Sequence, residues 1–330
     1  MTPITGKPVD WIPPALLLAI ALGGLALIGN PSTWVTLTVA GLAMGLLIFI
    51  MSSGLTLVFG LMDVMNFAHG LFIAVGAYVA VSVMKFFPAA AGSESLIVNL
   101  GALLPALLAA AAVAGLLGFF FERIIIKPVY GQHLKQILIT TGGMIVAEQL
   151  IHVLWGPDLL PLPRPSALRG AFLIGDMAIE KFRLVAVVIG LGVFATMIVL
   201  LNRTKIGLLI RAGVENKEMV EAMGYRIRRL FVAVFVAGSA LAGLGGALWG
   251  MYQESVTVAI GAQMMVLIFI VIIIGGLGSV GGCFTGALLV GLVANYVGYL
   301  SPKIALGSNI LLMVLVLLWR PQGLYPMSKQ

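Results

Sequence analysis

Long apolar runs, separated by short polar or glycine-rich stretches, make up almost the whole chain. Most runs are roughly 17 to 25 residues long, which is the length that a helix needs to cross about 30 Å of hydrocarbon. The pattern therefore predicts an all-α polytopic membrane protein with about ten transmembrane helices. The expected spans are residues 13–29, 35–61, 64–84, 99–121, 136–155, 184–201, 230–250, 262–280, 284–299 and 304–319.

Composition favours a membrane as the solvent of this chain. Hydrophobic residues make up 61% and charged residues 9% of the sequence, which leaves too little polar surface to coat a soluble globule. No polar stretch exceeds about 30 residues, so we expect residues 1–330 to form a single integral-membrane domain. The sequence contains no GxxxxGK[ST] phosphate loop, no HExxH or paired-cysteine spacing and no GxSxG motif. We therefore expect no enzyme activity, metal site or cofactor in this chain, and an energy source outside it.

Charged and aromatic residues predict how the spans lie in the membrane. All five tryptophans fall at expected span ends, where an indole ring favours the headgroup layer. The segment 202–229 carries seven basic residues and is therefore expected in the cytoplasm, together with residues 123–135 and both termini. The net charge of +7 follows from this topology and from anionic lipid, so it calls for no nucleic acid.

Two stretches interrupt the apolar pattern, near residues 60–70 and 275–286. The first contains Asp63, Asn66 and His69, and the second is rich in glycine. A spanning helix is broken only where protein or a cavity, rather than lipid, faces the free backbone groups. We therefore predict discontinuous helices at both places.

The stretches after the two breaks share a pattern. Each begins with small residues and ends in a tyrosine, Gly70 to Tyr78 and Gly286 to Tyr296. We interpret them as matching halves of an internal repeat, which transporters often use to build a solute site between the halves.

Polar side chains within the spans are candidates for a solute pathway. Ionisable groups are costly in lipid and usually face a cavity, which favours Asn66, His69 and Asp63 as residues that line or gate the path. Alternatively, Asp63 ends a helix at the cytoplasmic surface, and Asn66 and His69 cap free backbone groups. Tyr78 and Glu148 complete the candidate set, although a structural hydrogen bond to a neighbouring helix is the alternative for Glu148.

The segment 202–229 contains a short stretch with helical spacing. Val214, Met219, Val220 and Met223 would share one apolar face, and Gly224 would end the helix. A helix this short is not stable alone in water, so we expect it to pack against something. An apolar face at the cytoplasmic surface favours the groove of a partner protein. A helix lying on lipid is the alternative.

Several stretches, taken in order, resemble one family. The stretches that carry this resemblance are Gly54–Gly60, Asn66-Phe67-Ala68-His69-Gly70 and Gly76-Ala77-Tyr78. The chain resembles the permeases of branched-chain amino acid ABC importers, in the subunit type that carries an Asn-Phe-Ala-His-Gly motif. Four further stretches agree with that family: Glu122–Arg123 to Lys127–Pro128, the Arg211–Gly224 loop leading into Phe235–Gly246, the glycine run at 275–282 and Arg320–Leu324.

The resemblance implies an importer of several subunits in a bacterial inner membrane. This chain would pair with a second, usually related permease chain, and would work with two cytoplasmic ATPases, which bind ATP and Mg, and with a periplasmic solute-binding protein. The segment 205–226 would be the coupling element that seats in an ATPase. The residues expected at that contact are Arg211, Glu215, Glu218, Met219, Glu221, Ala222, Met223 and Gly224.

The resemblance leaves the solute and the energy source open to alternatives. Relatives of this family carry amino acids, urea, amides and small organic acids, and branched-chain amino acids or related small polar solutes are our expectation for this chain. A secondary transporter or channel is the alternative function, in which Asp63, His69 or Glu148 would carry a proton.

Overall fold

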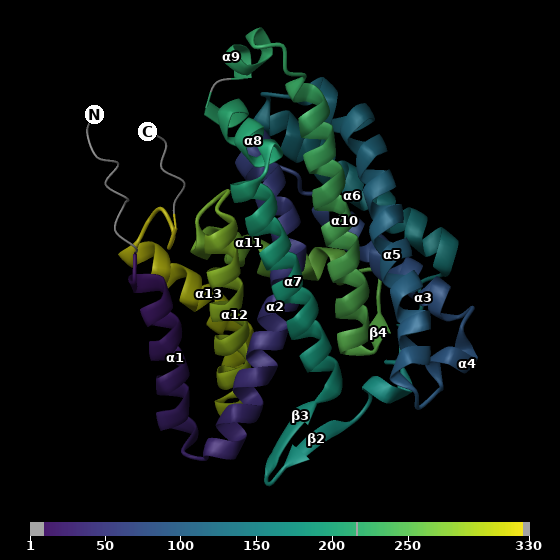
Figure 1. Cartoon of the computed structure of the whole chain (residues 1–330), viewed down its shortest axis with the longest axis vertical. Coiled ribbons are helices and arrows are strands. Elements are labelled where there is room, and N and C mark those ends of the chain that lie inside the picture. The colour runs from purple at the N-terminus through teal and green to yellow at the C-terminus, as the bar shows by residue number, and fades with distance from the viewer. Residues whose placement is uncertain (1–9, 216, 326–330) are drawn as a thin grey trace.

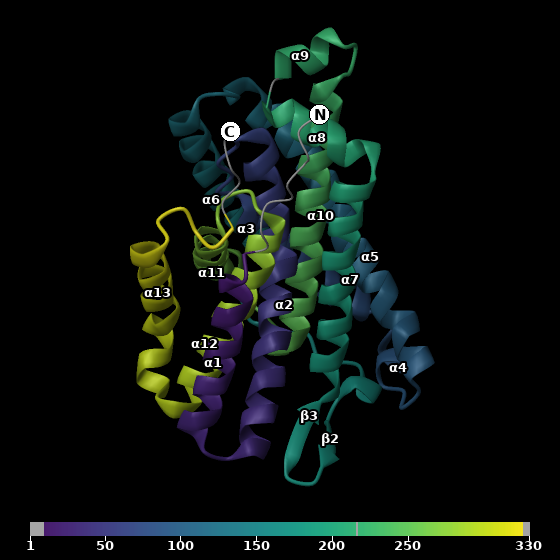
Figure 2. The ribbon, with the colours of Figure 1, turned by 60° about the vertical axis from the view of Figure 1, so that its left-hand side comes forward.

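The protein is predominantly helical, as the hydrophobic pattern predicts. The computed structural model describes residues 10–215 and 217–325. Its long helices stand side by side along the longest axis of the molecule (Figures 1 and 2). The elements in chain order are α1 (Ile12–Ile28), α2 (Pro31–Met62), α3 (His69–Met84), α4 (Pro88–Ala91), α5 (Leu96–Phe121), η1 (Glu122–Ile126), η2 (Lys127–Val129), α6 (His133–Trp155), β1 (Leu160–Pro161), η3 (Ser166–Leu168), β2 (Ala171–Ile174), β3 (Met177–Glu180), α7 (Lys181–Arg203), α8 (Lys205–Glu215), α9 (Lys217–Ala222), α10 (Ile227–Gln253), β4 (Ser255–Val256), α11 (Ile260–Gly275), α12 (Val280–Leu300) and α13 (Pro302–Trp319).

Each of the ten expected spans corresponds to a helix, but their lengths divide them into two groups. Within residues 10–215 and 217–325, six helical segments are long and apolar enough to cross a membrane. The other four are the shorter apolar helices α1, α3, α11 and the part of α13 from Gly307 to Trp319. A count of about ten membrane crossings therefore stays a prediction.

Two predicted span boundaries were wrong by several residues. The span expected at 64–84 starts only at His69, and the span expected at 262–280 ends at Gly275. In both places apolar or small residues continue into a stretch that is not helical, with Asn66 as the one larger polar residue, so hydropathy alone does not mark the boundary.

Helix α2 lies at the centre of the bundle and is the most buried of the six spans. Two of its buried hydroxyl groups are satisfied within the helix: that of Ser53 donates to the carbonyl of Ile50 at 2.8 Å, and that of Thr56 to the carbonyl of Ser52 at 2.8 Å. Glycine allows close approach of its neighbours, because a β-carbon on Gly54 would overlap the carbonyl oxygen of Gly238 in α10. Helices α6 and α7 are exposed over most of their length.

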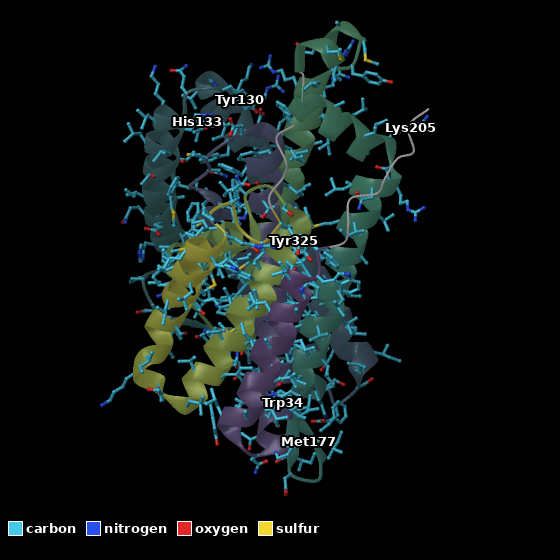
Figure 3. All side chains as sticks on the ribbon, turned by 90° about the vertical axis from the view of Figure 1, so that its left-hand side faces the viewer. Trp34, Tyr130, His133, Met177, Lys205 and Tyr325 are labelled. Atoms are coloured by element: carbon cyan, nitrogen blue, oxygen red, sulfur yellow. The ribbon has the colours of Figure 1, made fainter. Side chains whose placement is uncertain are left out.

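The two ends of the bundle carry different structures. Helices α8 and α9 extend from one end, which we call the loop end, whereas the β2–β3 hairpin extends from the other, the hairpin end (Figure 1). Figure 3 places Tyr130, His133 and Lys205 toward the loop end, and Trp34 and Met177 at the hairpin end. The basic stretch 123–135 and the segment 202–229 therefore share one end, as the charge pattern predicts.

Candidate functional site

The first interruption separates α2 from α3 and consists of residues 63–68, which we call the first break. Asp63 ends α2 with a left-handed backbone, φ 51°, and its N–H donates to the carbonyl of Phe59 at 3.1 Å. This conformation is uncommon for a residue with a β-carbon, although Asp tolerates it better than most. The chain then turns and enters α3 at His69. The first predicted discontinuity is therefore present.

A distant helix satisfies the backbone of the first break. The side-chain carbonyl of Gln136 accepts from the N–H of Met65 at 3.1 Å, and the hydroxyl oxygen of Thr140 accepts from the N–H of Phe67 at 3.1 Å. Gln136 and Thr140 lie one turn apart on α6 and are both fully buried. No helical backbone bond satisfies these N–H groups, so the two side chains supply their acceptors and hold the break in place.

Asn66 and His69 are buried beside the first break and have local hydrogen bonds. The side-chain oxygen of Asn66 accepts from the N–H of Ala68 at 3.1 Å, so it caps a backbone group in the turn that precedes α3. Nε2 of His69 donates to the carbonyl of Met51 at 2.9 Å and ties α3 to α2. Nδ2 of Asn66 and Nδ1 of His69 have no hydrogen-bond partner among the described residues. Each residue therefore has one structural contact and one unused polar atom.

The second interruption, residues 276–279, separates α11 from α12 and is called the second break. The hydroxyl oxygen of Ser279 accepts from the N–H of Gly282 at 3.1 Å and caps α12. The C-terminal segment closes the other side, because the N–H groups of Leu324 and Tyr325 donate to the carbonyls of Ile274 and Gly275, both at 2.9 Å. The second predicted discontinuity is therefore also present, and it too is held by a distant part of the chain.

The two breaks meet inside the bundle. Gly60, in the last turn of α2, packs directly against Gly278 of the second break, where a β-carbon on Gly60 would lie 2.5 Å from the Cα of Gly278. At the start of α3, a β-carbon on Gly70 would lie 2.7 Å from the carbonyl oxygen of Gly261 in α11. The structure thus brings together two regions that lie more than 200 residues apart in the sequence.

The other three pathway candidates are dispersed. The side chain of Asp63 is 77% exposed and lies 3.5 Å from Nε2 of His133 at the start of α6. Tyr78 is fully buried on α3, and its hydroxyl has no partner among the described residues. Glu148 is half-buried on α6. Asp63, Asn66 and His69 therefore lie in one short segment, but only Asn66 and His69 among these three are buried.

The segment 202–229 contains two helices, α8 and α9. Helix α9 ends as predicted: Gly224 is left-handed, φ 86°, and its N–H donates to the carbonyl of Glu221 at 3.0 Å. The expected apolar face is divided, because Val220 is buried whereas Met219 is 62% and Met223 68% exposed. Glu221 and Ala222 are also exposed. The side chains of the remaining coupling candidates, Arg211, Glu215 and Glu218, lie outside the described residues.

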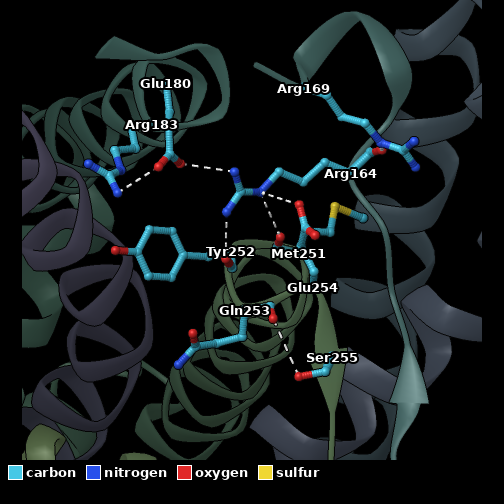
Figure 4. Close-up of polar contacts among 9 residues, drawn as sticks. All are labelled: Arg164, Arg169, Glu180, Arg183, Met251, Tyr252, Gln253, Glu254 and Ser255. Carbon is cyan, nitrogen blue, oxygen red and sulfur yellow. Dashed lines mark hydrogen bonds and ion pairs between the residues drawn. The ribbon is translucent and has the colours of Figure 1, made fainter. Parts of the chain in front are cut away.

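An arginine at the hairpin end joins three segments (Figure 4). Arg164 donates to the carbonyls of Met251 at 3.2 Å and Tyr252 at 2.7 Å, both in the last turn of α10. Its guanidinium also donates to Glu180 at 2.9 Å, and it lies 3.3 Å from Glu254. This planar group of five donors matches several acceptors at once, so it fixes the 156–180 connection onto α10.

Comparison with known proteins identifies the family. A family model described as "Branched-chain amino acid transport system / permease component" matches residues 37–319. The chain belongs to this family. Within residues 10–215 and 217–325, no group of three or more His, Cys, Asp or Glu side chains is placed to hold a metal ion. We refer below to the chain as the permease component.

Curated relatives cover most of the permease component. It is 28% identical to the high-affinity branched-chain amino acid transport system permease protein BraD of Pseudomonas aeruginosa, over 87% of this chain and 94% of that protein. It is 26% identical to LivH of Escherichia coli K12, over 86% of this chain and 92% of that protein. LivM of Escherichia coli K12 is 28% identical over 89% of this chain and 71% of its own length. No solved structure matches the chain significantly.

Three structural residues were not singled out as such from the sequence. Gln136 and Thr140 support the first break, and Arg164 holds the connection at the hairpin end. The available signal for the first two was a glutamine and a threonine one turn apart in a mainly apolar span. The Arg320–Leu324 motif, noted for its resemblance to the family, closes the second break.

Proposed function

We propose that the permease component forms the transmembrane path of an ATP-driven importer for branched-chain amino acids or related small polar solutes. ATP and Mg would be bound by two separate ATPase subunits on the cytoplasmic side of a bacterial inner membrane. A related second permease chain and a periplasmic solute-binding protein would complete the complex. Family membership supports the transport role, and the similarity to both LivH and LivM supports the pairing of two related chains.

The observation that carries the ATP-driven part of this proposal is the exposed face of α9. Met219 on the six-residue helix α9 and Met223 in the turn directly after it are well exposed at the loop end. A helix of this length is not stable by itself, and exposed methionines suit an adaptable docking contact. We propose that this face, with Glu221, Ala222 and Gly224, seats in a groove of an ATPase, and that the loop end is cytoplasmic.

The first break supports a place for the solute path. Buried polar atoms are nearly always hydrogen-bonded, so the unused atoms Nδ2 of Asn66 and Nδ1 of His69 are exceptions that call for an explanation. We propose that they meet the solute when the two breaks separate during transport. Asp63 would then lie at the cytoplasmic mouth, and Tyr78 and Glu148 further along the path.

The coupling part can be tested in proteoliposomes that contain the complete complex. The double variant Glu221→Lys plus Met223→Asp should lower ATP-driven leucine uptake by about tenfold or more, because it places charges on the docking face. Glu94→Lys plus Phe86→Asp makes matched changes at exposed positions near the hairpin end and should leave uptake within about twofold of wild type. Full uptake by an assembled double variant would contradict the docking role. Leucine uptake driven by a pH gradient without nucleotide would contradict the ATP-driven mechanism.

A second variant separates capping from solute contact. Asn66→Ser keeps an oxygen that can accept from the N–H of Ala68, but it removes the amide nitrogen. We expect the complex to assemble with a melting temperature close to wild type, whereas the leucine KM rises several-fold. An unchanged KM in a folded complex would assign Asn66 to capping alone.

A further inference from the structure

A cleft of about 560 Å³ opens at the loop end of the permease component. One wall comes from the end of α5 with η1 and η2, and the other from the connection between α9 and α10 and the first turn of α10. Its basic lining residues are Arg123, Lys127, Arg226, Arg228 and Arg229. All five side chains are exposed.

Among the described residues that line this cleft, basic groups outnumber carboxylates. Two carboxylates, Glu122 and Glu221, face the five basic groups. Glu122 is buried and accepts from the hydroxyl of Tyr130 at 2.6 Å. In the part of the chain that the structure describes, none of the five basic side chains forms an ion pair. The guanidinium carbon of Arg123 lies over the ring of Phe119, 5.9 Å from the ring centroid. The cleft is therefore suited to an anion.

The start of α10 adds to the positive potential. The helix is 27 residues long, and its N-cap residue Arg226 makes no side-chain cap bond, whereas the N–H groups of Ile227 and Arg229 donate to the carbonyls of Tyr225 and Arg226. The helix dipole favours negative charge at the same point where three arginines converge. A phosphate suits such a site because each of its oxygens can accept from arginine in a fork geometry.

The cleft lies at the ends of two candidate membrane spans. The segment Leu96–Val129 ends at it, and the segment Ile227–Gln253 begins at it. Further along the same two helices, away from the cleft, the side chains are apolar: Leu116 is 58% and Phe120 49% exposed on α5, and Val236 is half-buried on α10. A positive cleft directly above an apolar surface matches the two parts of a phospholipid.

We propose that this cleft binds an anionic phospholipid. The five basic side chains hold its phosphate group, and an acyl chain lies along the outward surfaces of α5 and α10. The site does not depend on which solute the permease component carries. A lipid in this position contacts both the end of α5 and the base of α9, so it holds the proposed docking element close to the membrane surface.

The proposal can be tested with the purified full-length chain, delipidated in detergent and titrated with defined lipids by native mass spectrometry. Phosphatidylglycerol should bind at least about tenfold more tightly than zwitterionic phosphatidylethanolamine, because each basic group near the headgroup favours net negative charge. Glycerol phosphate, which offers the same phosphate without acyl chains, should bind at least about tenfold more weakly than phosphatidylglycerol.

Two triple variants of equal charge separate the cleft from general basicity. Arg226→Gln, Arg228→Gln and Arg229→Gln together should weaken phosphatidylglycerol binding by about tenfold or more. A control variant removes the same charge from exposed positions at the loop end outside the cleft, by Lys135→Gln, Arg203→Gln and Lys205→Gln. Its phosphatidylglycerol binding should stay within about twofold of wild type. The double variant Arg123→Gln plus Lys127→Gln, on the opposite wall, should also weaken binding if the triple variant unfolds.

Three results would overturn the proposal. Equal phosphatidylglycerol binding by the wild type and by folded variants of either wall would show that the lipid binds elsewhere. Glycerol phosphate binding as tightly as phosphatidylglycerol would assign the cleft to a soluble phosphate. Lost co-purification of the ATPases with unchanged lipid binding in a cleft variant would assign the cleft to the ATPase.

Discussion

Gly60 and Gly278 bring the two interrupted regions of the bundle into direct backbone contact. A β-carbon on Gly60 would lie 2.5 Å from the Cα and 2.9 Å from the carbonyl oxygen of Gly278. Backbone atoms do not move aside as the end of a flexible side chain does, so any larger residue at position 60 forces the breaks apart. The contact between Gly60 and Gly278 therefore joins the two breaks into one structural unit.

Gly60→Val should destabilise the permease component by about 1–3 kcal/mol, because the added carbon atoms overlap backbone that is already in contact. Thermal unfolding in detergent would measure the loss. Gly142→Ala on α6 is the control, since a β-carbon there meets nothing within 4 Å. Equal melting temperatures for Gly60→Val and wild type would show that the contact between the breaks is not tight in solution.

Gln136→Leu should cost about 1–3 kcal/mol, because the buried N–H of Met65 loses its acceptor. The same change at Gln149, which is exposed on α6, provides the control. Unfolding midpoints of the two variants should differ clearly, with Gln149→Leu close to wild type. A Gln136→Leu variant as stable as Gln149→Leu would mean that the first break is satisfied by other groups.

Arg164→Lys should destabilise the hairpin end almost as much as Arg164→Leu, by about 2–4 kcal/mol. A lysine ammonium cannot reach two carbonyls and two carboxylates in the planar arrangement that the guanidinium provides. Arg169→Lys, in the same connection but at an exposed position, should have little effect. Limited proteolysis within residues 156–180 would report the loosening directly, and full protection of Arg164→Lys would contradict the prediction.

The pairing of Asp10 with Arg320 should make the packing of the chain ends sensitive to acid. The hydrogen bond from Arg320, at 2.7 Å, is the main cause that holds the pKa of Asp10 below its ordinary value, with the N–H of Ile12 adding to it. A lowered pKa in the folded state means that the stabilisation is present above the ordinary aspartate pKa near 4 and is lost as the pH falls through the folded-state value.

This dependence can be read from melting temperatures between pH 6 and pH 3. The wild type should lose more stability than Asp10→Asn over the lower half of that range, because the variant has no carboxyl to titrate at this position. Parallel curves for the two proteins would show that the pair contributes nothing to folding.

Sequence patterns were sufficient to predict the helices but not all of their ends. The apolar runs are long and unambiguous, so every expected span has a helix at its place. The start of α3 at His69 depends on the turn at Asp63 and on hydrogen bonds from α6, about 70 residues away, which no local periodicity records. The end of α11 at Gly275 depends in the same way on the C-terminal segment.

The candidate site was predictable in position but not in detail. Asn66 and His69 stand out because polar groups are rare in apolar surroundings, and the structure places both beside the first break. Which of their atoms is used locally and which is left free depends on the partners Ala68 and Met51. The contact between Gly60 and Gly278 follows from tertiary packing alone. Nothing in the local sequence around either glycine marks it as the partner of the other.

Helix α6 is mostly exposed, yet it supplies both hydrogen-bond acceptors for the first break. The amides of Met65 and Phe67 can therefore exchange their hydrogens with solvent only after α6 has moved away from the bundle. These two amides lie in a segment without helical structure, about 70 residues before the residues of α6 that protect them. The rate of deuterium uptake at Met65 and Phe67 therefore reports how often α6 separates from the bundle.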